Sequence, residues 1–211
     1  MFRPMALALF PLVMLAGCAS TPRLAPLPAA QEAFWDALRS HCGKAYAGAL
    51  ASDDARDAAM RRRAMIAHWA RCQPDSIAVA FHIADPEAPG GWNRSRTWVV
   101  TRHEDGLRLK HHHYHADGSA DAVTLYGGDT LSAGTARVQD FPVDAFSQAL
   151  FGREGLDASL TNVWRVEVDA AGMPGARFAY QLTRRNDPTR LFRVAFDLTE
   201  RVDPPPEAWG W

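Results

Sequence analysis

The stretch RTWVVTRHEDGLRLKHHHYHADGSADAVTLYGGDT, from Arg96 to Thr130, decides the fold that this sequence predicts. Runs rich in Thr, Val, Leu and aromatic residues alternate in it with two Asp-Gly pairs, at positions 105–106 and 117–118. Asp-Gly between two such runs is the strongest short-range signal for a β-hairpin. The stretch therefore predicts a meander of three consecutive antiparallel strands: Thr97–His103, Gly106–His115 and Ala122–Tyr126.

The middle strand contains four of the eight histidines of the chain. Because side chains alternate between the two faces of a strand, Leu107 and Leu109 share a face with His111, His113 and His115. The leucines mark this face as the buried one. A row that begins with leucines and ends with imidazoles indicates the mouth of a cavity rather than a dry core.

The Asp-Gly turn at 117–118 also predicts a register for this hairpin. A two-residue turn would pair His113 with Ala122 and His111 with Thr124. Such small partners would leave space beside the imidazoles for a ligand.

The rest of the chain continues the β pattern, because apolar and polar residues alternate over short segments bounded by turn residues. Two helices are predicted, over Ala29–His41, where apolar residues recur at helical spacing, and over Pro142–Phe151, which starts with proline and is followed by glycine. The segment Asp53–Arg63 also has the composition of a helix, with an aspartate that could cap it. Arg63–Arg71 is ambiguous, since it could be a strand or extend that helix, and a strand is favoured. The further strands predicted are Lys44–Ala51, Ala64–Arg71, Ser76–Ile83, Thr135–Asp140, Val163–Asp169, Ala176–Thr183 and Leu191–Thr199.

This order of elements predicts a mainly β fold of about nine or ten antiparallel strands, with an N-terminal helix and one further short helix. We expect an up-and-down meander that forms a closed or nearly closed barrel, with a two-sheet sandwich as the alternative. The arrangement resembles the lipocalins, although their Gly-x-Trp signature is absent from the first strand, where Gly43–Tyr46 reads GKAY. The single domain is expected to span 29–202, followed by a Pro- and Trp-rich tail at 203–211.

The N-terminus has the features of a targeting sequence. Arg3 precedes the apolar run Met5–Ala16, which is shorter than the ~20 residues that a membrane-spanning helix needs. The segment Leu15-Ala16-Gly17-Cys18 resembles the lipobox of bacterial lipoproteins. This resemblance implies that residues 1–17 are removed, that Cys18 is lipidated, and that 18–28 is a proline-rich tether. Ala19 then favours the outer membrane, facing the periplasm; an ordinary secretory signal is the alternative.

Charge and cysteine content indicate which partners are unsupported and how the remaining cysteines are expected to pair. The whole chain has 23 Lys and Arg against 24 Asp and Glu, so no basic surplus points to nucleic acid. With Cys18 lipidated, Cys42 and Cys72 remain, and they should be oxidised in a compartment beyond the inner membrane. A hairpin of Lys44–Ala51 with Ala64–Arg71 would bring them together, so a structural disulfide is expected.

Three stretches resemble an uncharacterised family of bacterial secreted proteins and lipoproteins. They are RSRTWVVTR at Arg94–Arg102, GLRLKHHHYHADGSADAVTLYGGDT at Gly106–Thr130, and TNVW at Thr161–Trp164. The resemblance covers most of the mature chain and implies no activity.

The histidine row raises the question of a metal. Two histidines at alternate positions can share an ion, but zinc requires further ligands at ~2.0–2.1 Å, for which His103 on the neighbouring strand, His82 and Asp129 are candidates. The identity of any metal, or of haem, is not determined by the sequence. The alternative is a polar lining of the barrel mouth, formed by His111, His113 and His115 without a metal.

Three functions follow from these patterns. The favoured one is a non-enzymatic, lipid-anchored envelope protein whose barrel binds a small apolar or amphipathic ligand or contacts an envelope partner. The alternatives are a metal or haem protein ligated by His111 and His113, and a purely structural lipoprotein with a filled interior. Ligand affinity should fall as these histidines protonate near their unperturbed pKa of about 6.5. The oligomeric state is not determined.

Overall fold

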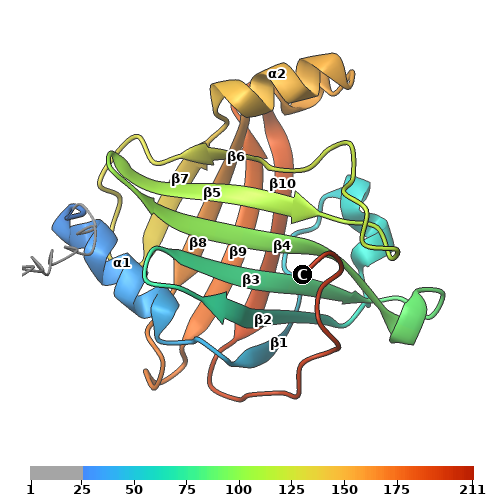
Figure 1. Ribbon diagram of the computed structural model, residues 1–211, viewed down its shortest axis with the longest axis horizontal. Coiled ribbons are helices and arrows are strands. Elements are labelled where there is room, and N and C mark those ends of the chain that lie inside the picture. Colours follow the sequence, from blue (N-terminus) through green and yellow to red (C-terminus); the bar gives the residue numbers. More distant parts are fainter. Residues whose placement is uncertain (1–25) are drawn as a thin grey trace, which may run out of the picture.

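The computed structural model describes residues 26–211, so the expected signal peptide and the lipidation site Cys18 lie outside the described residues. The fold is mainly β: ten antiparallel strands form one sheet that curls into a nearly closed barrel, as expected (Figure 1). Within residues 26–211, no helix is long and apolar enough to cross a membrane.

Each strand pairs with its neighbours in the chain, except that β1 pairs with β10, and β6 and β7 form the two edges of the sheet. The single sheet with β1 on β10 favours the barrel over the sandwich. The strands are β1 (Ala45–Leu50), β2 (Met65–Cys72), β3 (Ser76–Ala84), β4 (Trp92–His103), β5 (Gly106–His113), β6 (Tyr126–Asp129), β7 (Val138–Pro142), β8 (Asn162–Val168), β9 (Arg177–Arg184) and β10 (Asp187–Asp197). The helices are α1 (Ala29–Arg39) and α2 (Ala145–Arg153), with 3₁₀ turns η1 (Ala55–Met60), η2 (Pro89–Gly91) and η3 (Asp157–Ser159).

The edges β6 and β7 meet at a seam that Gly128 makes possible. Gly128 forms an isolated bridge with Val143, and the backbone N–H of Asp144 donates to the carbonyl of Gly127 at 3.0 Å. A Cβ on Gly127 would lie 1.8 Å from the carbonyl oxygen of Leu109, and one on Gly128 would lie 1.8 Å from that of Pro142. Gly128 therefore permits the contact between β6 and β7, and Gly127 permits the close pairing of β6 with β5.

Helix α1 closes one end of the barrel (Figure 1). Its side chains Phe34, Trp35 and Leu38 are fully buried in the core cluster. The amide nitrogen of Gln31 donates to the hydroxyl of Thr130 at 2.9 Å and ties the helix to the loop after β6. The helix predicted over Ala29–His41 is therefore present and closes one end of the barrel. Its buried side chains fill the barrel interior at that end.

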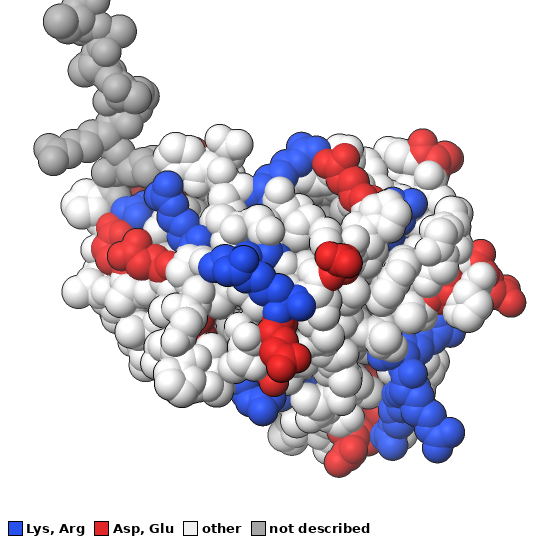
Figure 2. Space-filling view, turned by 90° about the horizontal axis from the view of Figure 1, so that it is seen from below, with Lys and Arg blue, Asp and Glu red and all other residues white. Residues whose placement is uncertain are grey.

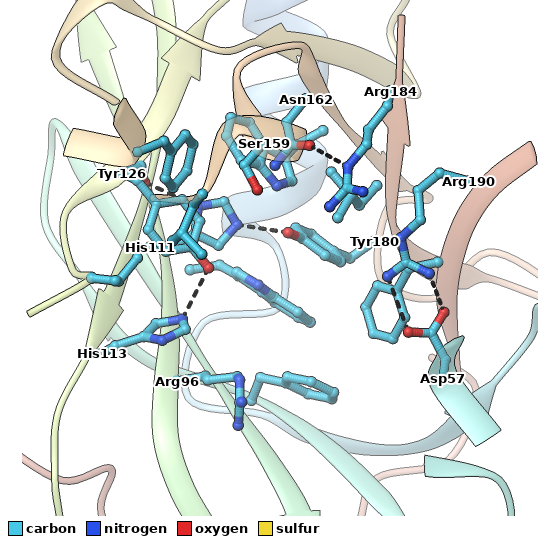
Figure 3. A pocket seen from close by; sticks show the side chains of 18 of the residues that line it. Asp57, Arg96, His111, His113, Tyr126, Ser159, Asn162, Tyr180, Arg184 and Arg190 are labelled. Carbon is cyan, nitrogen blue, oxygen red and sulfur yellow. Dashed lines mark hydrogen bonds and ion pairs between the residues drawn. The ribbon is translucent and has the colours of Figure 1, made fainter. Parts of the chain in front are cut away.

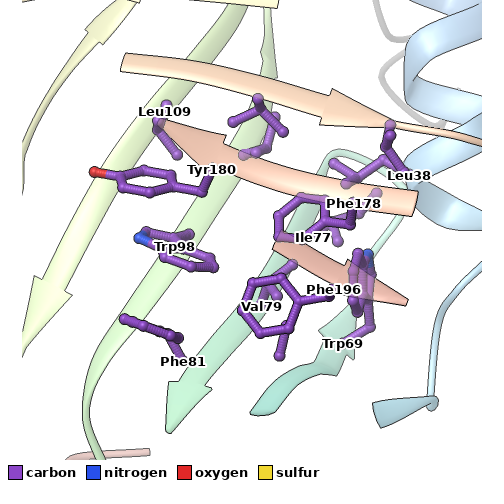
Figure 4. Packing of buried hydrophobic residues seen from close by; sticks show 14 of the residues in the cluster. Leu38, Trp69, Ile77, Val79, Phe81, Trp98, Leu109, Phe178, Tyr180 and Phe196 are labelled. Atoms are coloured by element: carbon purple, nitrogen blue, oxygen red, sulfur yellow. The ribbon is translucent and has the colours of Figure 1, made fainter. Parts of the chain in front are cut away.

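The core consists of the inward rows of the strands. Phe81, Trp98 and Tyr180 form a continuous aromatic stack across the barrel, with ring centroids 4.6 Å and 4.4 Å apart (Figure 4). Leu107 and Leu109 are buried beside it, which confirms the inward face assigned to β5. Stacked aromatic pairs add about 0.5–1.5 kcal/mol each beyond their area burial.

The ambiguous segment is a strand, β2, and it pairs with β1. This hairpin brings Cys42 and Cys72 together, and they form a disulfide with a Cα–Cα distance of 6.1 Å. The helix expected over Asp53–Arg63 is wrong in type and length, since only the 3₁₀ turn η1 forms there. The polar and small residues of this segment do not form an apolar helical stripe that could be buried.

The predicted register of the β5–β6 hairpin is wrong. His111 pairs with Tyr126 and not with Thr124, because β5 ends at His113 and β6 begins only at Tyr126. The segment between the bridge at Tyr114–Ala120 and β6 leaves the regular ladder, and Leu125 has a positive φ of 61° in it. Because this segment is irregular, the partner of His111 lies two residues later in the chain than predicted.

The tail at 203–211 lies on the outer surface of the barrel. The N–H of Trp209 donates to the carbonyl of Arg94 at 3.0 Å, and Arg71 forms an ion pair with Glu207 at 2.6 Å. The guanidinium of Arg71 also lies 4.9 Å from the ring centre of Trp211. Positive and negative side chains are interspersed on the face seen in Figure 2, as expected from the nearly balanced charge.

The seam makes a first prediction. Gly128→Ala should lower the free energy of unfolding by roughly 3 kcal/mol, because its Cβ would force β6 and β7 apart. Gly152→Ala in α2 is the control, since a Cβ there meets nothing within 4 Å and should add about 0.5 kcal/mol of helix stability. Urea unfolding measures both, and equal stability of the two variants would contradict the seam's dependence on glycine.

Candidate functional site

A cavity of about 270 Å³ lies in the barrel at the end away from α1. The course of β5 shows which end this is: the strand starts at Gly106, beside Gln31 of α1, and ends at His113, in the cavity wall. The walls are formed by inward side chains of β3, β4, β5, β8, β9 and β10, and the rim by η1, η3 and the segment before β6. The cavity thus occupies the place where the row of leucines and histidines predicted a mouth.

His111 is held at the centre of this cavity by two hydrogen bonds (Figure 3). Its Nδ1 lies 3.1 Å from the carbonyl oxygen of Tyr126, and its Nε2 lies 2.7 Å from the hydroxyl of Tyr180. A carbonyl only accepts, so Nδ1 carries the proton and Nε2 accepts from the hydroxyl. Burial lowers the pKa of His111 to about 3, with a further contribution from neighbouring His113. His111 is therefore a neutral imidazole.

His113 lies nearer the mouth and contacts the same tyrosine. Its Nε2 is 3.2 Å from the hydroxyl of Tyr126. Burial, followed by the positive charge of Arg96, lowers the pKa of His113 to about 4. Burial raises the pKa of Tyr126 to about 12. The two groups are thus uncharged and form a polar pair within an otherwise aromatic wall.

Aromatic rings form most of the remaining wall. Tyr126 stacks on His111 with centroids 4.5 Å apart, and Trp164 lies 5.0 Å from His111 across the seam. The stack of Phe81, Trp98 and Tyr180 described above supplies the other side. The expected open space beside His111 is occupied by Tyr126, because the shifted register places this ring opposite the imidazole.

Three arginines stand at the mouth and were missed by the sequence analysis. Arg96 continues the inward row of Trp98 on β4, and Arg184 continues the inward row of Tyr180 on β9. Arg190 lies at the start of β10 and forms a bidentate ion pair with Asp57, with N–O distances of 2.6 and 3.0 Å. If the predicted strands had been extended by one or two residues, the alternation of side chains would have placed Arg96 and Arg184 on the inward face.

The other predicted site residues lie elsewhere. The side chain of His115 is 56% exposed beyond the end of β5, 4.0 Å from Asp121. His103 and Asp129 line a separate small cleft at the α1 end of the barrel, and Asp129 forms a bidentate ion pair with Arg108 at 2.6 and 2.9 Å. Of the predicted ligands, only His111 and His113 line the main cavity.

This geometry does not supply a metal site of the expected kind. Within residues 26–211, no group of three or more His, Cys, Asp and Glu side chains lies in positions to hold a metal ion. Both ring nitrogens of His111 are engaged by Tyr126 and Tyr180. The metal alternative therefore lacks the third ligand that it requires.

The structure also changes the pH at which these histidines are expected to protonate, and with it the expected pH dependence of ligand affinity. The sequence predicted protonation near pH 6.5, whereas burial moves the pKa values of His111 and His113 to about 3 and about 4. Both side chains stay neutral across the range in which exposed histidines titrate. The cavity is consequently not a histidine sensor near pH 6.5.

The depressed pKa values predict how stability depends on pH. Below about pH 6.5 the unfolded chain binds protons that the folded His111 does not bind, so the free energy of unfolding falls as the pH falls. Each such histidine contributes up to about 1.4 kcal/mol per pH unit. His111→Gln should therefore show a shallower decline between pH 6.5 and pH 4 in urea unfolding. Leu131→Gln, at an exposed position without a titrating group, is the control and should keep the wild-type slope.

No match was found for this chain among protein-family models, curated proteins or solved structures. The fold and the cavity geometry are therefore the basis on which a function is inferred.

Proposed function

We propose that this protein is a non-enzymatic, lipid-anchored envelope protein that binds a small amphipathic ligand in the mouth of its barrel. The observation that carries the proposal is the cavity itself: its aromatic walls lie deep between the strands, and its polar groups, His113, Asn162 and the arginines, lie towards the mouth. Apolar walls with a few placed polar groups are typical of small-molecule sites. A ligand with an apolar body and a polar end fits this division.

The chemistry of the cavity favours binding over catalysis. His111 is neutral, and its nitrogens are engaged by neighbouring groups, so it is poorly suited to transfer protons near neutral pH. Burial raises the pKa of Tyr180 well above its ordinary value, which keeps its hydroxyl protonated. These groups fix the shape and polarity of the cavity, as a binding site requires.

The size of the cavity limits the ligand. A cavity of ~150 Å³ can hold benzene, so 270 Å³ admits one aromatic ring with a short chain. The volume lies just below the range of ~300–1,000 Å³ found for ligand pockets. A large lipid with several acyl chains would not fit inside the barrel.

The proposed anchor is compatible with access to this mouth. The lipobox resemblance places the lipid on Cys18, and the described chain enters the fold at Leu27, which is buried beside the helix that plugs the far end. The tether would then hold the plugged end nearer the membrane. The mouth would face away from the membrane and stay open to ligand.

Titration with 4-phenylbutanol, an uncharged probe of suitable size, tests the binding proposal. Isothermal calorimetry should detect binding to the wild type. Val123→Trp, which fills the rim of the cavity, should weaken it at least about tenfold, since a loss of ~1.4 kcal/mol suffices. Leu131→Trp is the control, because Leu131 is 78% exposed in a loop outside the cavity. Equal binding by all three proteins would refute the proposal.

A further inference from the structure

The two cations of the mouth that lack a carboxylate partner point to the charge of the ligand. Arg190 is neutralised by Asp57 and Asp54, with N–O distances of 2.6 and 2.9 Å. Among residues 26–211, neither Arg96 nor Arg184 forms an ion pair with any Asp or Glu. Two half-buried guanidinium groups thus line one small cavity without a counter-charge of their own.

Arg184 is the more strongly positioned of the two. Its Nε donates to the side-chain oxygen of Asn162 at 3.1 Å, and Asn162 is itself only 4% exposed. Figure 3 shows the guanidinium beyond this hydrogen bond directed towards the cavity, above Tyr180. Within the described chain, the terminal nitrogens of Arg184 make no hydrogen bond. The buried side-chain amide of Asn162 therefore positions the guanidinium of Arg184, whose terminal nitrogens can donate to a ligand.

The surroundings of Arg184 disfavour its positive charge. Burial, and then the nearby cations Arg190 and Arg56, lower the pKa of Arg184 below its ordinary value. Asp187 and Asp54 oppose this effect, but their ion pairs are with Arg56 and Arg190. An incoming anion would relieve the repulsion and gain a charge-assisted hydrogen bond.

Arg96 adds a second positive charge from the opposite wall. It lies on β4 next to His113, whose pKa it helps to lower, and its only hydrogen bond within the described residues is a donation to Ser95 at 3.1 Å. Arg96 and Arg184 come from strands on different sides of the barrel, so they surround the entrance. Positively charged side chains therefore stand on both sides of the opening.

We propose that the ligand is an amphipathic anion: its carboxylate binds at the mouth to the guanidinium of Arg184, with Arg96 as the second cation, and its apolar body lies against the aromatic walls. This inference rests on the proposed binding function and specifies the chemical class of the ligand. A guanidinium pairs with a carboxylate through two parallel N–H···O bonds, which gives orientation as well as affinity.

A matched series of probes tests the proposal. 4-Phenylbutyrate, 4-phenylbutanol and 4-phenylbutylamine share one apolar body and differ in the charge of the end group. Calorimetry near neutral pH should rank the acid above the alcohol by about tenfold or more, because a hydrogen bond to a charged group contributes ~1.5–3 kcal/mol. The amine should bind most weakly. Equal affinities for the acid and the alcohol in the wild type would overturn the inference.

Variants then assign the preference to residues. Arg184→Gln should reduce the affinity for 4-phenylbutyrate about tenfold and leave that for 4-phenylbutanol nearly unchanged, and Arg96→Gln should have a smaller effect in the same direction. Arg184→Lys retains the charge without the fork and should fall between. Arg165→Gln is the control, since Arg165 lies on the outside of β8 in an ion pair with Asp140. An unchanged ratio of acid to alcohol affinity in Arg184→Gln would refute the assignment.

Two further results separate the possible failures. If 4-phenylbutanol binds and Val123→Trp abolishes it, but the acid gains nothing, the anion inference fails and the binding function stands. If none of the three probes binds, the binding function itself fails. Inorganic phosphate alone should bind much more weakly than 4-phenylbutyrate, because it has no apolar body; equal binding would mean that the mouth is a site for free anions and would overturn the amphipathic assignment.

Discussion

The rest of the structure depends on the close contact between β6 and β7. Gly128 allows this contact because it stands where a Cβ would overlap the carbonyl oxygen of Pro142, at the end of β7. The contact is reinforced by Asp144, which caps α2 through Ser147 and forms an ion pair with Lys110 at 2.6 Å. Burial alone would raise the pKa of Asp144, but the hydrogen bonds from Lys110 and Ser147 outweigh it and the pKa is lowered. The seam is thus held by charge as well as by backbone pairing.

The cavity is a consequence of this closure. The seam brings the end of β5 and the start of β6 against β8, so that His111 and Tyr126 face Trp164 at 5.0 and 5.7 Å. At the other end, α1 fills the barrel with Phe34, Trp35 and Leu38. The interior is therefore filled at the α1 end and open at the other end, where His113, Arg96 and Arg184 are half-buried.

Burial decides the character of the histidines. A row of imidazoles in a sequence indicates proton transfer, metal binding or pH sensing, and each of these needs a free nitrogen or an accessible proton. In the barrel, His111 has hydrogen-bond partners at both nitrogens and a depressed pKa, so it is a rigid neutral part of the wall. The charged groups of the mouth are instead the arginines, whose basicity survives partial burial.

The sequence by itself determined the strand pattern, the inward face of β5, the plugging helix and the Cys42–Cys72 pairing. These follow from alternation and turn residues, which act over a few positions of the chain. It did not determine the register of β6. The turn rules apply to regular hairpins, and the irregular segment before Tyr126 interrupts the pairing between β5 and β6. Nor did it reveal that Arg96 and Arg184 share one cavity, since they lie on strands far apart in the chain. Only the closure of the barrel decided that, because long-range pairing alone places side chains of distant strands around a common space.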